Sequence, residues 1–189
     1  MATIEFLKSA KRQFQYYKQL GEQAMSQLKD EELFWQPNEE SNSVAIIVKH
    51  LHGNMLSRWT DFLTTDGEKE WRNRDGEFEN DWTTRDQVLK AWNEGWQCLF
   101  NALESITDDD LNSIVYIRNE GHTILEAINR QLAHYPNHVG QIVYIGKLCG
   151  NEGWKSLSIP RNKSKDYNAD KFSRNKGTRH FTDDLLDKK

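Results

Sequence analysis

Apolar residues recur mainly at gaps of three or four in four separate stretches of the chain. This spacing places side chains along one face of an α-helix. The stretches cover residues 7–28, 44–63, 88–106 and 124–150. The pattern predicts four long amphipathic helices, each with one face buried against the others.

Residues that favour helix ends flank these stretches. Ser43 stands where its hydroxyl can cap the second helix, and Thr3 can cap the first. The third and fourth helices begin with capping boxes, Thr84 to Gln87 and Thr123 to Glu126. Gly150 is a suitable stop for the fourth helix.

The segments between the helices differ in character. Phe34 and Trp35 form an aromatic pair in the first connector, which we expect to close one end of the core. Residues 67–82 are polar and interrupted by glycine, which indicates a long surface crossover. Residues 114–117 form a short β-type run, expected to be a small hairpin or an extended arm. The predicted fold is therefore all-α, a four-helix bundle with one long crossover and a short extended segment before the last helix.

The end of the chain has a different composition from the rest. Residues 161–189 are polar with few apolar positions, so we expect an irregular C-terminal tail beyond a bundle domain at residues 1–160. Residues 160–189 carry nine Lys or Arg against five Asp or Glu, whereas residues 1–159 have a net charge of −8. The acidic body is unlike a strongly basic nucleic-acid binder.

Composition also bears on the compartment. The chain has no apolar run of 18 residues and no apolar signal core near its N-terminus, so we expect a cytoplasmic protein without a membrane partner. Cys98 and Cys149 lie far apart without a Cys-x-x-Cys pattern, which is typical of reduced thiols. Seven tryptophans are expected to serve mainly in core packing.

Two histidines, His134 and His138, lie four residues apart in the fourth predicted helix. Side chains at this spacing share one helix face, so both imidazoles can reach a common metal ion. The alternative is a pair of polar residues on a solvated face. Pro136 between them favours a kinked helix, and a helix broken near Ala133 is the other interpretation.

The second predicted helix offers His50 and His52 as a third ligand. Counting 100° per residue, His52 lies about 80° and His50 about 120° from the centre of the apolar stripe. Periodicity alone therefore buries His52 and leaves His50 towards the edge.

The segments Val48-Lys49-His50-Leu51 and His134-Tyr135-Pro136-Asn137-His138-Val139-Gly140-Gln141 together resemble the motifs of the DinB-like superfamily. The likeness extends over roughly residues 3–150 by helix order and spacing, and the arm from Trp154 to Arg161 looks like a bacterial branch of it. That superfamily includes bacillithiol S-transferases and mycothiol-dependent maleylpyruvate isomerases. The resemblance implies a histidine triad of His50, His134 and His138 that binds a divalent metal, zinc or nickel. It selects His50 over His52, and chemistry assigns no role to Gln141.

Three histidine ligands leave one metal position open, which is typical of catalytic sites. Tyr135 stands where a His-Glu-x-x-His protease has its glutamate, so peptide hydrolysis is not expected. The expected function is a metal-dependent S-transferase, in which a low-molecular-weight thiol attacks a small electrophile in stress or detoxification. The alternatives are a stress-related metal-binding protein without turnover and a damage-inducible protein that binds nucleic acid through its basic tail. Many members of the superfamily are dimers, so a homodimer is a further expected partner.

Overall fold

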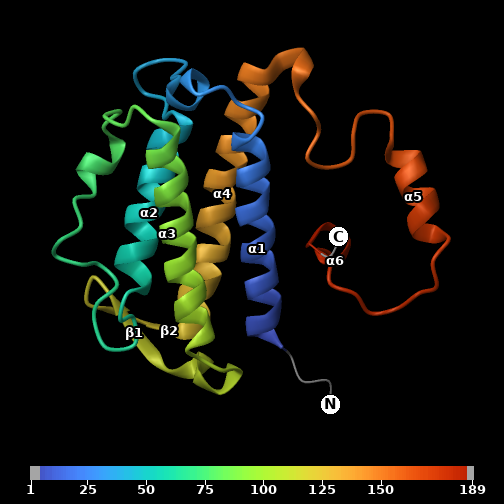
Figure 1. Ribbon diagram of the computed structural model, residues 1–189. Helices are drawn as coiled ribbons and strands as arrows, with labels where there is room; N and C mark the ends of the chain where they lie inside the picture. Colours follow the sequence, from blue (N-terminus) through green and yellow to red (C-terminus); the bar gives the residue numbers. More distant parts are fainter. Residues whose placement is uncertain (1–4, 187–189) are drawn as a thin grey trace.

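A computed structural model describes residues 5–186, except for the side chain of Asn151. Its body is a bundle of four long helices: α1 (Phe6–Met25), α2 (Val44–Trp59), α3 (Arg85–Glu104) and α4 (Ile124–Gly150). Figure 1 shows that α1 and α4 run in one direction and α2 and α3 in the other. Because α2 and α3 are parallel, the chain must return along the bundle between them, and residues 60–84 do so. The predicted all-α bundle with one long crossover is confirmed.

The core is shared between two helix pairs, α2 with α3 and α1 with α4. Trp92 and Trp96 of α3 are fully buried, as expected for tryptophans in a core. The first connector behaves differently from the prediction, because Trp35 is 41% exposed. A 3₁₀ turn, η1 (Glu31–Phe34), directs Leu33 into the core instead and leaves Phe34 at its edge.

Two of the predicted capping residues form their hydrogen bonds at the helix starts. The hydroxyl of Ser43 accepts a hydrogen bond from the backbone N–H of Ile46, and Thr84 forms a capping box with Gln87. The guanidinium of Arg85 donates to the carbonyls of Met25 and Leu28, which satisfies the end of α1. Thr3, the expected cap of α1, lies outside the described residues.

The extended run before α4 is a hairpin of β1 (Ile114–Ile117) and β2 (Glu120–Thr123). Its two-residue turn, Arg118 and Asn119, has positive φ angles of 56° and 62°, as the tight hairpin turn that matches strand twist requires. Asp66 in the crossover accepts hydrogen bonds from both backbone N–H groups of this turn, at 2.8 Å each. The hairpin therefore fastens the crossover to the end of the bundle. The 3₁₀ turn η3 (Asp108–Asn112) connects α3 to this hairpin.

Beyond α4 a short turn, η4 (Asn151–Gly153), leads into an arm whose Trp154 packs against Gly146 of α4. The tail that follows is not irregular throughout, because it contains α5 (Ser164–Phe172) and α6 (Asp183–Leu186). Residues 164–172 hold no glycine or proline, and an acidic first turn and a basic last turn match the helix dipole.

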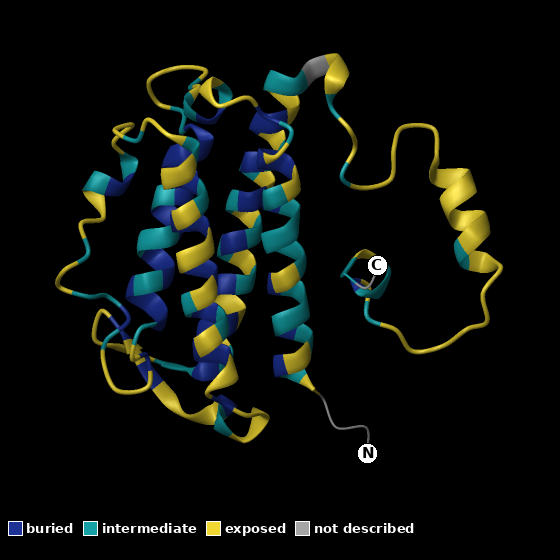
Figure 2. Ribbon diagram, in the orientation of Figure 1, coloured by how far each residue is buried: buried dark blue, intermediate teal, exposed yellow. Residues whose placement is uncertain are grey.

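The tail touches the bundle near its end. No residue of α5 is buried, and Figure 2 shows this helix exposed along most of its length. The chain then returns to α1, where Thr182 is fully buried and Asp183 pairs with Arg12 at 2.7 Å. None of the described helices has the length and apolar character needed to span a membrane.

Candidate metal centre

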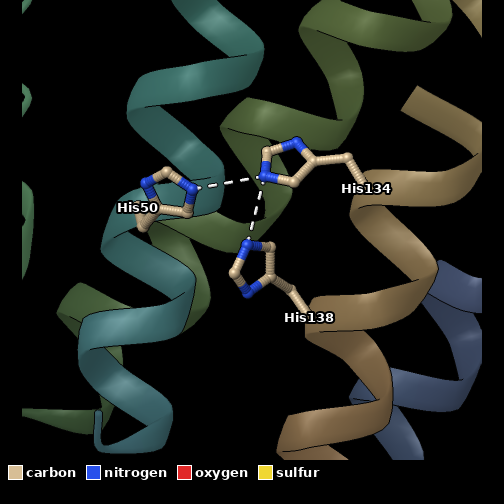
Figure 3. Close-up of side chains that lie close together, drawn as sticks. All are labelled: His50, His134 and His138. Carbon is tan, nitrogen blue, oxygen red and sulfur yellow. Dashed lines mark hydrogen bonds between the residues drawn. The ribbon is translucent and has the colours of Figure 1, made fainter. Parts of the chain in front are cut away.

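Three histidines from two helices meet between α2 and α4. Figure 3 shows His50 of α2 facing His134 and His138, which lie one turn apart on α4. The Nε2 atom of His134 lies 3.4 Å from Nε2 of His50 and 3.1 Å from Nε2 of His138. One nitrogen from each ring lies within 4.8 Å of the others, so the cluster could hold a metal ion. His50 is buried, and the other two are half-buried.

Each ring is oriented by an oxygen on its far side. Nδ1 of His50 donates to Glu77 at 2.9 Å. Nδ1 of His134 donates to the amide oxygen of Gln131, and Nδ1 of His138 donates to that of Gln141, each at 3.1 Å. Because these acceptors hold the protons on Nδ1, all three Nε2 atoms present lone pairs to one another. Such an arrangement is repulsive unless a cation lies between them.

Two of the three nitrogen–nitrogen distances match those in a transition-metal site. Zinc–nitrogen bonds of about 2.0–2.1 Å at a tetrahedral angle place two ligand atoms about 3.3 Å apart. The two nitrogen–nitrogen distances of 3.1 and 3.4 Å bracket this value. Imidazole donors suit zinc, nickel, copper and iron, and three of them leave room for a further ligand.

The surroundings lower the pKa of both α4 histidines, so these two rings are neutral at neutral pH. Burial lowers the pKa of His134 to about 3, and the neighbouring His138 and His50 contribute in the same direction. Burial also lowers the pKa of His138, although its hydrogen bond to Gln141 opposes the effect. Since metals bind the neutral imidazole, His134 and His138 can act as ligands at neutral pH without first losing a proton.

Glu77, which the sequence did not reveal, completes the support of the centre. It comes from η2 (Asp75–Phe78) in the crossover, is 5% exposed, and receives two hydrogen bonds from Arg72, at 2.7 and 2.9 Å. Burial raises the pKa of Glu77, but the hydrogen bonds from His50 and Arg72 outweigh it, so the net pKa is lowered. The carboxylate therefore stays ionised beside His50. The one sequence signal is Gly53, since a Cβ there would collide with the Glu77 side chain.

The family model described as "Protein of unknown function (DUF1572)" matches residues 2–163. The chain belongs to this family. The matched region contains all four long helices and the three histidines, and it ends just before α5. No curated protein and no solved structure matches the chain.

In this DUF1572 chain, His52 lies outside the cluster. It is half-buried, and its Nε2 lies 3.4 Å from a carboxylate oxygen of Glu94 on α3. Periodicity predicted the wrong burial for His50 and His52 because it treats one face of α2 as exposed to solvent. The crossover covers that face instead: Phe78 stacks on the His50 ring with centroids 5.1 Å apart.

Tyr135 and Pro136 lie between the two α4 histidines, and neither contributes a ligand or a base to the centre. Tyr135 is fully buried, donating its hydroxyl to Asn54 and accepting from Trp59 Nε1, each at 3.0 Å. Burial raises its pKa, so it supplies no base to the centre. The helix continues through Pro136, which excludes a break near Ala133.

Proposed function

We propose that this chain is a metal-dependent S-transferase of the DinB-like superfamily, with His50, His134 and His138 as ligands to zinc or nickel. The observation that carries the proposal is the meeting of three Nε2 lone pairs, each ring being oriented by its own oxygen acceptor. The superfamily assignment is supported by the four-helix order and by histidines at the motif positions of α2 and α4.

A divalent ion held by three neutral imidazoles keeps a coordination position open and lowers the pKa of a thiol or water bound there. The chain's own contribution is orientation. Glu77 and Arg72 hold His50, while Gln131 and Gln141 hold the two histidines of α4.

The choice of thiol over water rests on the lack of a spare base. Among the described residues, Glu77 is the carboxylate hydrogen-bonded to the triad, and Arg72 and His50 already occupy its oxygens. Activation of water for hydrolysis commonly uses an additional carboxylate or histidine as general base. Transfer to a thiol needs less: a carbon–sulfur bond forms, the bond to the leaving group breaks, and the thiol proton passes to solvent.

The test begins with protein purified without a histidine tag. Elemental analysis should find about one divalent transition metal per chain, and His134→Ala/His138→Ala should contain none. The control is His122→Ala, which alters a histidine outside the cluster. Stoichiometric metal in the double variant would exclude the site.

The loaded protein is then incubated with a panel of low-molecular-weight thiols and with 1-chloro-2,4-dinitrobenzene or styrene oxide. Mass spectrometry should detect the thioether faster than in the uncatalysed reaction, and the double variant should not accelerate it. Stoichiometric metal with no thioether from any pair would favour the alternative, a metal-binding protein without turnover. Salt-dependent binding to random-sequence DNA would favour the nucleic-acid alternative.

A further inference from the structure

A groove opens beside the histidine cluster, between the start of α2 and the second half of α4. It encloses about 580 Å³, within the range of small-molecule sites. Its walls are formed by apolar side chains, among them Ile47, Ile145 and Leu148. The polar part of the lining comes from the amides of Asn42, Asn137 and Gln141 and from the hydroxyls of Ser41 and Tyr144.

The groove has no charged lining residue, although 29% of the chain is charged. Four other hollows of the described surface each include at least two charged side chains. A ligand that carries a formal charge would lose hydration here without gaining an ionic partner. The lining therefore favours an uncharged molecule with an apolar body and one or two hydrogen-bonding groups.

Gly140 supports the view that this space is kept open. A Cβ built on any other glycine of the described α-helices meets a neighbouring atom at 3.3 Å or less, so close packing accounts for each of them. A Cβ on Gly140 meets nothing within 4 Å, and its φ is not positive. Glycine weakens a helix relative to alanine, and neither packing nor backbone conformation requires it at this position. What its missing side chain provides is room in the groove.

The groove adjoins the metal centre through shared residues. Gln141 lines the groove and also accepts the hydrogen bond from His138 Nδ1. Ile47, on the opposite wall, lies one helical turn before His50. Pro136 and Asn137, which lie between the two histidines in the sequence of α4, also line the groove. None of the three histidines lines the groove, so a molecule lying in it would reach the cluster through Gln141, on the Nδ1 side of His138.

We propose that this groove binds the apolar body of an uncharged electrophile and holds it beside the histidine centre. Its place in a reaction rests on the proposed S-transferase function, whereas binding itself does not. The amides of Asn42, Asn137 and Gln141 would then receive the polar groups of that molecule.

Binding can be measured without turnover by using N-phenyl-1-naphthylamine, an uncharged probe that fluoresces in apolar sites. Metal-free and metal-loaded protein should both bind it. Octanol should displace the probe at a concentration at least ten-fold lower than octanoate or octylamine, which share its chain length but are charged. Equal or better displacement by either charged competitor would overturn the proposal.

Two substitutions test the location. Gly140→Leu fills the groove, and its control is Gly153→Leu, because a Cβ on Gly153 also meets nothing within 4 Å but lies outside the lining. Leu148→Asp places a charge in the groove, and its control is Leu63→Asp, because both leucines are 49% exposed. Each groove variant should weaken probe binding at least ten-fold, with each control within two-fold. Circular dichroism should show unchanged helicity, and unchanged probe affinity in both groove variants would refute the assignment.

Further measurements distinguish a failure of the S-transferase function from a failure of the groove assignment. Where thioether formation is observed, the groove variants should keep stoichiometric metal and raise the KM for 1-chloro-2,4-dinitrobenzene at least ten-fold. A lack of thioether in the unmodified protein would count against the S-transferase function, while the probe titrations would still decide the groove. If sedimentation shows a dimer that Leu148→Asp converts to monomer, a second copy covers the groove and the proposal is wrong.

Discussion

The carboxylate of Glu77 lies 2.9 Å from Nδ1 of His50, although 27 positions separate the two residues and they belong to different elements. This contact joins the crossover to the histidine cluster. It also holds the proton of His50 on Nδ1, so that Nε2 faces His134. The loop between α2 and α3 is thus part of the support of the centre as well as a connection.

Replacing Glu77 by Ala should weaken metal affinity and stability together. His50 loses its orienting acceptor, which typically costs 10–100-fold in metal affinity. Arg72 loses its bidentate partner in a buried position, and breaking such a pair typically costs about 3–5 kcal/mol. A competitive chelator titration and urea unfolding measure the two effects. Glu79→Ala, at an exposed neighbouring position, should change neither; a Glu77 variant that behaves like it would show that the contact is unimportant.

His50 and His52 should respond differently to substitution. His50→Ala removes one of the three converging nitrogens and should weaken metal affinity at least ten-fold. His52→Ala removes a contact between α2 and Glu94, so it should lower the melting temperature slightly and leave metal affinity nearly unchanged. Chelator competition with both single variants checks this prediction, and the reverse order of affinities would contradict the ligand assignment.

The metal-free protein should lose stability as the pH falls below about 6.5. The pKa of His134 is lowered from 6.5 to about 3 in the fold, and that of His138 is lowered as well. The unfolded chain therefore binds more protons in this window, and stability declines from pH 6.5 towards pH 3. Glu77, with a pKa lowered from 4.5, adds its own loss only at more acidic pH.

Melting temperatures of chelator-treated protein between pH 7 and pH 4.5 measure this effect. The His134→Ala/His138→Ala variant should show a shallower decline over the same range. Parallel curves for the two proteins would mean that these histidines do not keep depressed pKa values.

Removing the tail after Arg161 should leave the bundle helical and able to bind metal. No apolar residue beyond Leu157 packs against the core in the described part of the chain. The lost contacts are on α1, where Thr182 is buried and Arg12 pairs with Asp183, so we expect a small decrease in melting temperature. Circular dichroism and elemental analysis of the truncated protein test this. A loss of cooperative unfolding would show that the tail is structural.

Local regularities explain which features were predictable from the sequence. The periodic stripes predict four helices, and Thr84 and Ser43 predict where two of them begin, because helix periodicity and capping depend on neighbours within a few residues. The i, i+4 spacing of His134 and His138 likewise requires both rings to share a face of α4. A β-type run predicted the hairpin as one of two alternatives, and a polar segment interrupted by glycine predicted the long crossover.

Only the tertiary structure decided what surrounds those faces. Periodicity treats the flank of α2 that carries His50 as exposed, yet the crossover lies over it and buries the residue. Leu33 rather than Trp35 enters the core, because a 3₁₀ turn rotates the connector. Glu77 and Arg72 stand in a segment without periodicity, so their pairing depends on how residues far apart in the chain pack together. The sequence by itself determined the helices and the histidine pair, and the motif resemblance pointed to His50. Long-range packing is the physical reason why His50 and not His52 joins the pair, and it alone brings in the carboxylate of Glu77.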